Sequence, residues 1–366
     1  MFIYITYCIN IIIENIKNKF QLFHNNYLYN KKNKNKINDL CFHILGVGTG
    51  HITQAKVLYD IYLQNGYKIP YIIYACKDKK NIKNIENLFK NSLVIHKYMN
   101  ITEKDINNYN LNIKTAIKVI YYYFKYYNIL KYKADLYISF GTHVPYIIYN
   151  KQIIITNVIL INGWKEKLYS NISKIISTNK IYSILFKNNL TNLTLPSLIN
   201  MNKINRDNID KKMCIAYSVS GFTFFNTLIE IAKNNKKYTF YYFTNYITNN
   251  NNNIDIPENI ILMKKDLFTF KEYLSKTTCV LCTTGNELIQ ECVYNKIPNA
   301  SIYCDINQNE QYNNYKLYVK KYKWSIEMNN NLIIDDLIIN NSIINSYNEF
   351  IELNKNAKQR ILDIIN

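Results

Sequence analysis

Short apolar runs alternate with longer stretches of helical period along this chain, from residue 40 onward. Residues 40–46 are apolar and strand-like, and residues 52–66 repeat apolar positions with helical period until Gly66, a typical helix stop. Alternation of strands and helices predicts a parallel, doubly wound sheet. For this half of the chain the pattern predicts strands at 40–46, 71–76, 134–141 and 151–163, and helices at 52–66 and 113–130.

The same alternation restarts after a polar segment at residues 200–212, which has the composition of a linker. Two α/β halves would face a cleft at the carboxyl ends of their strands, where open α/β proteins bind ligands. We therefore expect two Rossmann-like domains. The predicted boundaries are an extension at 1–39, domains at 40–200 and 201–345, and a C-terminal helix at 346–366, for which packing against the first domain is one option. The second half predicts strands at 213–221, 237–244, 259–263, 277–284 and 300–305, and helices at 222–235, 265–276, 286–296 and 309–322.

The chain is strongly basic, with a formal net charge of +19, but only two of its 45 basic residues, Arg206 and Arg360, are arginine. Proteins that read nucleic acid favour arginine for bidentate contacts, so we expect no specific nucleic-acid partner. The lysines are spread along the chain, as on a solvated surface. A basic face that attracts anionic substrates or lipids is the alternative.

The eight cysteines are scattered and lack the spacing of a disulfide scaffold, which indicates a reducing compartment such as the cytoplasm. Cys279 and Cys282 lie on an apolar, strand-like run, and no second pair supplies further zinc ligands, so we interpret them as core residues. The apolar run at residues 1–13 is shorter than the roughly 20 residues that span a bilayer. We therefore expect an ill-defined tail here, and an amphipathic extension with peripheral membrane contact is the alternative.

Three of the eight glycines lie within five residues, at Gly46, Gly48 and Gly50, between a strand-like run and a helical one. A glycine-rich turn at this place lets backbone N–H groups and the positive end of the helix approach an anion such as phosphate. His51 follows where the turn meets the helix, and it suits a general base or a phosphate contact. A purely structural tight turn is the alternative. His43, in the middle of the strand, is expected in the core.

A second turn of this type lies at residues 283–287, between a predicted strand and a predicted helix. Thr284, Gly285 and Asn286 can present amide and hydroxyl groups there to a diphosphate. Glu291 follows Gly285 by six positions, and its carboxylate can accept hydrogen bonds from two ribose hydroxyls. The turn and this glutamate together predict a nucleotide site.

The last candidate segment is NEQYNN at residues 309–314, which opens another predicted helix. Its Glu310 and Gln311 suit sugar hydroxyls, and a plain polar helix start is the alternative. Glu287, one turn before Glu291, is interpreted as an acidic residue that complements its own helix dipole.

The order of these motifs resembles the GT-B glycosyltransferases, specifically the MurG-like group that includes the monogalactosyldiacylglycerol synthases. Residues 46–55 (GVGTGHITQA) resemble the first glycine loop of that group, and residues 134–149 resemble its second loop, a strand that runs into a glycine turn. Residues 283–303 resemble its nucleotide-sugar signature, in which a glycine precedes a glutamate by six positions. Residues 309–314 resemble the Gln-Gln-x-x-Asn segment that follows, so the likeness covers roughly residues 40–325.

The resemblance implies the GT-B fold, with an acceptor-side first domain, a second domain that binds a UDP-sugar, and neither a metal nor a cofactor besides that co-substrate. This chain departs from the family pattern in the turn at 213–221, which keeps few glycines, and in the second loop, which has a threonine and a histidine where a glycine and an aromatic residue are usual. The implied donor-binding residues are Ser220, Gly221, Thr284, Gly285, Asn286, Glu291, Glu310 and Gln311; the acceptor and diphosphate loop residues are Gly48, Thr49, Gly50, Gly141 and Thr142; the candidate bases are His51 and, alternatively, His143.

The implied reaction is the inverting, metal-independent transfer of a hexose or N-acetylhexosamine from a UDP-sugar to an acceptor hydroxyl, with His51 as the preferred base. The acceptor is open, and a lipid-linked acceptor is one option. Two other functions also fit the sequence. One is a nucleotide-sugar epimerase of the same fold, which would need no acceptor, and the other is a non-catalytic protein that binds UDP-sugars or polyanions.

Overall fold

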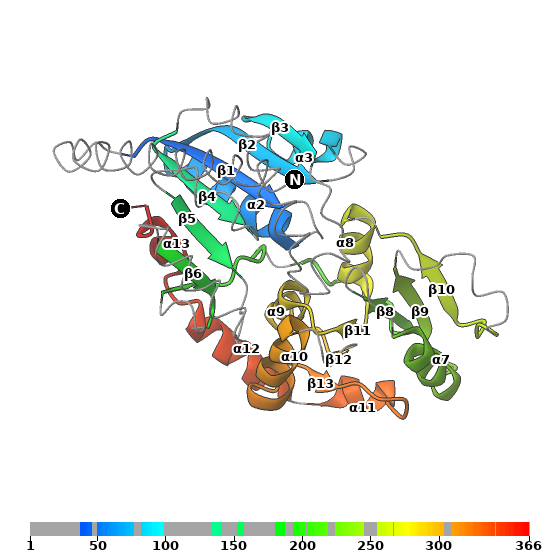
Figure 1. Ribbon diagram of the computed structural model, residues 1–366. Coiled ribbons are helices and arrows are strands. Elements are labelled where there is room, and N and C mark those ends of the chain that lie inside the picture. The colour runs from blue at the N-terminus through cyan, green and yellow to red at the C-terminus, as the bar shows by residue number, and fades with distance from the viewer. Residues whose placement is uncertain are drawn as a thin grey trace, which may run out of the picture.

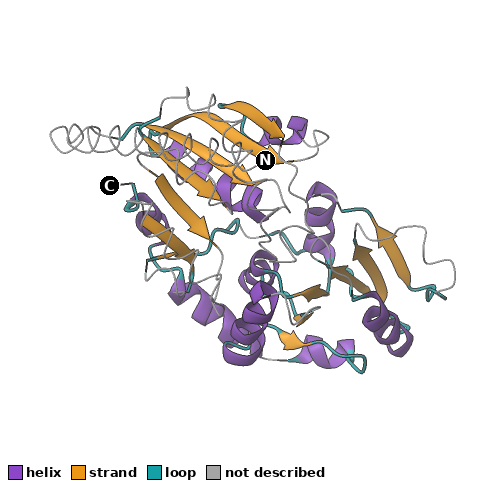
Figure 2. Ribbon diagram, in the orientation of Figure 1, coloured by secondary structure: helices purple, strands orange, loops and turns teal. Residues whose placement is uncertain are grey.

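The protein forms two lobes, each built on a parallel sheet with helices beside it (Figure 1, Figure 2). We call the sheet of β1–β7 with α2 and α3 the N-lobe, and the sheet of β8–β13 with α7–α11 the C-lobe. The α/β fold class predicted from the sequence is confirmed. The computed structural model describes residues 37–45, 50–76, 82–98, 134–140, 152–156, 180–186, 193–201, 204–218, 224–244, 255–265, 267–303, 309–340 and 342–365.

The centre of the N-lobe sheet is β1 (Asp39–Leu45), which lies between β2 (Lys68–Cys76) and β4 (Leu136–Phe140). The described strands run parallel in the order β3-β2-β1-β4-β5-β6-β7, so their carboxyl ends meet at one edge. The order reverses between β1 and β4, the position at which open α/β sheets form a ligand crevice. The other N-lobe elements are α2 (Gly50–Gln64), α3 (Ile82–Leu88), β3 (Leu93–Tyr98), β5 (Gln152–Thr156), β6 (Lys180–Ile184) and β7 (Thr194–Leu195).

The C-lobe repeats this plan around β8 (Met213–Tyr217) and β11 (Cys279–Thr283). Its described strands are also parallel, in the order β10-β9-β8-β11-β12-β13, and the order reverses between β8 and β11. Each lobe therefore presents one switch point. The other elements are α7 (Phe225–Asn234), β9 (Thr239–Phe243), β10 (Ile260–Met263), α8 (Leu267–Lys276), α9 (Asn286–Tyr294), β12 (Asn299–Ile302), α10 (Asn309–Tyr315), the π-helix η4 (Lys316–Lys321), β13 (Ile326–Glu327), α11 (Ile334–Ile339), α12 (Ser342–Leu353) and α13 (Ala357–Leu362).

Helix α2 follows from its sequence in a simple way. Ile52, Ala55, Leu58 and Tyr62 recur with helical period and are all buried, so one face of the helix packs on the N-lobe sheet. Gly66 then adopts a φ of +84°, in the left-handed region that glycine tolerates best, and the chain turns into β2. The apolar period and Gly66, which are close together in the sequence, therefore specify the helix and the place where it ends.

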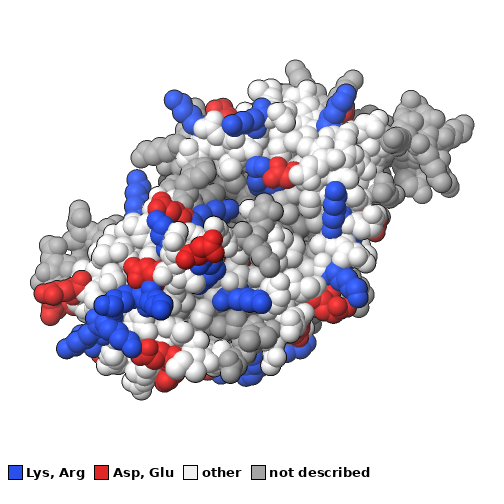
Figure 3. All heavy atoms as spheres, turned by 180° about the vertical axis from the view of Figure 1, so that it is seen from behind, with Lys and Arg blue, Asp and Glu red and all other residues white. Residues whose placement is uncertain are grey.

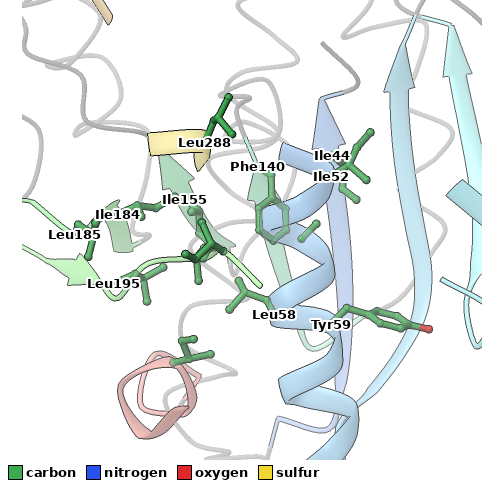
Figure 4. Packing of buried hydrophobic residues seen from close by; sticks show 14 of the residues in the cluster. Ile44, Ile52, Leu58, Tyr59, Phe140, Ile155, Ile184, Leu185, Leu195 and Leu288 are labelled. Carbon is green, nitrogen blue, oxygen red and sulfur yellow. The ribbon is translucent and has the colours of Figure 1, made fainter. Parts of the chain in front are cut away.

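The hydrophobic core continues from one lobe into the other. Leu288 of α9 belongs to the same buried cluster as Phe140 of β4 and Ile155 of β5 (Figure 4). Trp324, which is 1% exposed, stacks on Tyr318 and packs against Phe186, so aromatic side chains of the C-lobe cover the end of the N-lobe sheet. The amino end of α9 is consequently held against the N-lobe by packing.

The C-terminal helices return to the N-lobe (Figure 1). The hydroxyl of Tyr62 in α2 donates a hydrogen bond of 3.2 Å to the carbonyl of Ile361 in α13. The backbone N–H of Ser197 donates one of 2.6 Å to Oδ1 of Asn354, just after α12. Glu349 of α12 also accepts a hydrogen bond of 2.8 Å from Nε1 of Trp324 in the C-lobe, so these C-terminal helices link the two lobes. The domain boundaries stay a prediction.

Cys279 and Cys282 are fully buried in β11, as expected for core residues. Sγ of Cys279 lies 3.3 Å from Sγ of Cys214 on the neighbouring strand, and burial raises the pKa of the Cys282 thiol to about 12. His43 is likewise a core residue of β1, where burial lowers its pKa to about 4. Within the described ranges, no group of three or more His, Cys, Asp or Glu side chains could hold a metal ion.

Lysines and acidic residues are interspersed on the face of the molecule that Figure 3 shows. Several form exposed pairs along helices, such as Lys276 with Glu272 at 2.7 Å and Lys233 with Glu230 at 2.8 Å, which contribute little to stability. In the part of the chain that the structure describes, no helix is both long enough and apolar enough to cross a membrane.

Candidate functional site

The amino ends of α2 and α9 meet at the boundary between the lobes. Gly50 is the first residue of α2, and Glu287 lies in the first turn of α9. A Cβ atom added to Gly50 would lie 2.9 Å from Oε2 of Glu287, closer than real Cβ contacts, and 3.0 Å from Oε1, which is tighter than most of them. Glycine therefore permits a carboxylate of the C-lobe to approach the N-lobe backbone. The helices that follow the two turns singled out by the sequence thus adjoin each other.

Gln54, one turn into α2, contacts the same carboxylate. Its Nε2 donates a short hydrogen bond to Oε1 of Glu287, and its side chain is almost fully buried. Because Gln54 follows Gly50 by four residues, both lie on one face of α2. A carboxylate is favourable at a helix amino end, which carries partial positive charge. Glu287 therefore joins the lobes where two helices begin.

The turn after β11 is fixed by backbone and hydroxyl contacts. The N–H of Thr284 donates to the carbonyl of Ile302 at 3.1 Å, and the N–H of Gly285 donates to that of Thr283 at 2.6 Å. The Thr284 hydroxyl donates to the carbonyl of Gln311 in α10 at 2.7 Å. These hydrogen bonds hold the turn in place. The first turn of α9 can then present amide groups to an anion, because the first N–H groups of a helix lack intrahelical acceptors.

The side chain of Asn286 is buried and is held by other side chains of the protein. Its Oδ1 accepts a hydrogen bond of 2.8 Å from Nε2 of Gln290 and a short one from the hydroxyl of Tyr318. Oε1 of Gln290 in turn accepts a short hydrogen bond from the Ser197 hydroxyl. Asn286 is 2% exposed, so this polar network positions α9. Its backbone, at the first position of the helix, is the part that remains a candidate donor contact.

Helix α10 brings Gln311 beside the turn. Gln311 is 5% exposed, and its Oε1 is buried with no hydrogen-bond partner among the described residues. Nδ2 of Asn314 donates to the carbonyl of Thr284 at 3.0 Å, which fixes α10 against the turn. An unpaired buried acceptor costs about 1–3 kcal/mol. A hydroxyl donor from a ligand or a water would remove that cost, so Oε1 of Gln311 is one of the α10 atoms suited to a sugar.

Glu291 lies one turn after Glu287 on the same face of α9 and is half-buried. Burial raises the pKa of its carboxyl group above the ordinary value, and the charge of Lys271 in α8 lowers it in part. No described residue forms a hydrogen bond with its carboxylate oxygens. Burial of the charged carboxylate therefore costs solvation free energy. Hydroxyl donors from a ligand could replace the lost contacts with water.

His51 is half-buried in the first turn of α2, directly after Gly50. The structure thus brings together His51, Gly50, the 284–286 turn and Gln311 around the two helix amino ends. Glu310 lies in α10 next to Gln311, with only its backbone described. The other predicted site residues, Gly48, Thr49, Gly141, Thr142, His143, Ser220 and Gly221, lie outside the described residues.

Sequence reasoning missed two polar residues of this site. Gln54 lies within an ordinary helical pattern and gave no signal of its own. Glu287 was interpreted only as a residue that complements its own helix dipole, but its carboxylate contacts the other lobe. The spacing of Gly50 and Gln54 on one helix face was the only available hint.

Neither a family model nor a curated relative matches the sequence. The structure is similar to that of the glycotransferase of kitacinnamycin, with a TM-score of 0.61 and 8% identity over 90% of this chain and 98% of that one. It is also similar to Arabidopsis thaliana UGT89C1 complexed with UDP-L-rhamnose (TM-score 0.59, 9% identity, 90% and 99% covered). A third similar structure is Acinetobacter baumannii MurG (TM-score 0.50, 12% identity, 90% and 99% covered).

These likenesses extend over both lobes of this chain and nearly the whole of each neighbour. At such low identity they identify the fold. The chain has the GT-B fold, with two Rossmann-like domains, as the sequence predicts.

Proposed function

We propose that this GT-B-fold protein is a glycosyltransferase that moves a hexose or N-acetylhexosamine from a UDP-sugar to an acceptor hydroxyl. The observation that carries the proposal is the close approach of Gly50 and Glu287, by which the helices that follow the two predicted phosphate-binding turns adjoin at their amino ends. The GT-B neighbours add support, since one of them was solved with UDP-L-rhamnose and others bear the names glycotransferase and glycosyltransferase.

The donor would lie along α9 and the start of α10. Glu291 would accept hydrogen bonds from the two ribose hydroxyls, since its carboxylate is half-buried and lacks partners among the described residues. The diphosphate would lie at the Thr284–Gly285 turn and the amino end of α9, where amide groups and the helix dipole favour anions. Gln311, with Glu310, would bind the sugar, because Oε1 of Gln311 is an acceptor that lacks a donor.

The acceptor would bind on the N-lobe side, next to His51. A neutral His51 would take the proton of the acceptor hydroxyl as that oxygen forms a bond to the anomeric carbon. The bond from the anomeric carbon to the UDP oxygen breaks in the same step, which inverts the configuration. His143 is the alternative base.

The leaving UDP would be stabilised by the amino end of α9 and not by a metal ion. This part of the proposal predicts that turnover persists in EDTA. A loss of turnover in EDTA that magnesium restores would contradict the metal-independent route.

The proposal is tested by incubating the protein with UDP-glucose, UDP-galactose and UDP-N-acetylglucosamine and measuring the UDP released, with UDP binding measured by calorimetry. We expect one of these donors to be turned over and UDP to bind. Glu230→Gln in α7, whose carboxylate pairs with Lys233 on the surface, is a control that should behave as the wild type. A protein that binds no UDP and releases none from any donor would refute the proposed function.

A further inference from the structure

The sulfur atoms of Cys214 and Cys279 lie 3.3 Å apart in the interior of the C-lobe. We propose that this pair is a site of oxidative modification, at which a small disulfide such as oxidised glutathione converts the two thiols to a disulfide between the central strands β8 and β11. The inference concerns the core of the C-lobe alone and does not rest on the proposed function.

The register of the C-lobe sheet places the two thiols together. Strands β8 and β11 run parallel, and Cys214 and Cys279 are directly paired across them. Neighbouring strands lie about 4.8 Å apart, and paired residues point their side chains to the same face of the sheet. Both side chains are fully buried in the hydrophobic cluster that also holds Ala216 and Leu281. The fold therefore keeps two sulfur atoms in contact that are 65 residues apart in the sequence.

The CxxC spacing of Cys279 and Cys282 does not form this pair. Residues three apart in a strand point to opposite faces of the sheet. Cys282 is accordingly buried in the other hydrophobic cluster, together with Val280 and Cys292. Sheet pairing, and not proximity in the sequence, therefore selects Cys214 as the partner of Cys279.

The folded C-lobe protects the two thiols from oxidation. Burial raises the pKa of the Cys214 thiol, and the contact with Cys279 adds to that rise. The thiolate is the form that attacks a disulfide, so the pair stays reduced while both strands are covered. Oxidation is expected when the C-lobe opens locally, and the closing of the strands then brings the two sulfur atoms back together.

The reaction consists of two exchange steps. The thiolate of one cysteine attacks a sulfur of oxidised glutathione, forms a mixed disulfide and releases one glutathione thiolate. As the strands come together, the thiolate of the other cysteine attacks the protein sulfur of the mixed disulfide and releases the second glutathione thiolate. One S–S bond breaks and one forms at each step, and the two thiol protons pass to the two molecules of reduced glutathione.

A bond between Cys214 and Cys279 would close a loop of the chain that contains α7, β9, β10 and α8. Closing such a loop reduces the conformational entropy of the unfolded chain, so the oxidised protein should be harder to unfold. Strand β11 also leads directly into the Thr284–Gly285 turn. The disulfide would therefore fasten the strand that carries this turn to its neighbour.

The test incubates the folded wild type with oxidised glutathione in urea below its unfolding midpoint, where local opening is more frequent. Free thiols are then alkylated, and the protein is digested with trypsin and analysed by mass spectrometry. We expect the peptides that follow Lys212 and Lys276 to be linked, with a mass lower than their sum by two hydrogen atoms, and dithiothreitol to separate them. After removal of glutathione, the oxidised protein should have an unfolding constant in urea about tenfold or more below that of the reduced protein.

Cys282→Ala is the matched control, because Cys282 lies in the same strand as Cys279 and is equally buried. The tryptic peptide of Cys279 also carries Cys282 and Cys292, so the variants assign the bond. The linked peptides should form in Cys282→Ala as in the wild type and be absent in Cys279→Ala. If Cys279→Ala fails to fold, Cys214→Ala, which removes the other sulfur, takes its place with the same expected result.

Four outcomes overturn the inference. Oxidised wild type without linked peptides would show that the two thiols are core residues only. Linked peptides that persist in Cys279→Ala or Cys214→Ala, or that are lost in Cys282→Ala, would assign the bond to other cysteines. An oxidised protein no more stable than the reduced one would show that the native fold does not accommodate the bond. None of these readouts uses a nucleotide, so they are independent of whether the protein binds UDP.

Discussion

Replacing Glu291 by glutamine should stabilise the free protein and weaken UDP binding at the same time. Burial raises the pKa of Glu291, which means that the folded protein disfavours the charged carboxylate. Glutamine has nearly the same shape and no charge, so the free energy of unfolding should rise at neutral pH. Lys271 offsets part of the effect, because its positive charge favours the carboxylate.

The pH dependence of protein stability shows in which direction Glu291→Gln changes the melting temperature. An acid whose pKa is raised in the folded state binds more protons when folded, so the protein loses stability as pH rises from the unfolded pKa through the folded one. The ordinary value is 4.5. Glu291→Gln should therefore raise the melting temperature at pH 7.5 and change it little at pH 4.

The loss of UDP affinity follows from the hydrogen bonds proposed for the ribose. A hydrogen bond to a charged acceptor contributes about 1.5–3 kcal/mol, and a factor of ten in affinity corresponds to about 1.4 kcal/mol. Exchange of a carboxylate that accepts two hydroxyls for an amide oxygen should therefore weaken UDP binding by about ten- to a hundredfold. The loss should be smaller for 2′-deoxy-UDP, which lacks one of those hydroxyls.

Calorimetric titration with both nucleotides and thermal unfolding at the two pH values measure these effects. Glu349→Gln is the control, because its exposed carboxylate accepts from Nε1 of Trp324 far along the chain from the turn, and UDP binding should not change. A Glu291→Gln protein that loses melting temperature together with UDP affinity would show that the residue supports the fold. Unchanged UDP affinity would refute the assignment of the ribose to Glu291.

Three further predictions concern the core, a turn and the sugar site. Trp324→Ala should lower the free energy of unfolding in urea by about 3–5 kcal/mol, because a large buried ring at the boundary between the lobes is lost; a loss below about 1 kcal/mol would contradict this packing. Gly66→Ala should cost about 1 kcal/mol in the same assay, because its φ of +84° disfavours a Cβ while no atom lies within 4 Å of one; no loss would show that the turn rearranges. Gln311→Leu should leave stability unchanged or higher, since an unpaired buried acceptor is removed, and should weaken binding of the UDP-sugar that is turned over more than binding of UDP. Equal weakening of UDP-sugar binding and UDP binding would show that Gln311 does not contact the sugar.

Local sequence signals were sufficient for most of the fold. The apolar period of residues 52–66 predicted α2, and Gly66 predicted its end, because a helix face and a left-handed turn leave their marks in neighbouring residues. The pattern did not predict β3 (Leu93–Tyr98) or β6 (Lys180–Ile184), in which polar residues such as His96, Lys97, Lys180 and Ser183 interrupt the apolar run. For residues 309–322 it predicted one helix, and the structure continues α10 as the π-helix η4.

The sequence likewise predicted some parts of the candidate site and not others. A glycine-rich turn, a second turn with one glycine, and a glutamate six residues after that glycine were visible in the sequence because they are local features of strand–turn–helix units. The sequence could not decide that Asn286 faces Gln290 and Tyr318 in the interior, or that Oε1 of Gln311 is buried without a donor. Those properties depend on which helices pack around a turn.

The sequence by itself determined most of the described elements and their parallel strands in two halves, because each depends on the periodicity and backbone demands of a few adjacent residues. Only the tertiary structure decided which carboxylate approaches which glycine. Glu287 and Gln54 are far apart along the chain, and their contact exists because buried aromatic and aliphatic side chains hold the lobes together. Hydrophobic packing is non-directional, so many sequences could form such a core, and the polar pairs that it brings together cannot be read from local pattern.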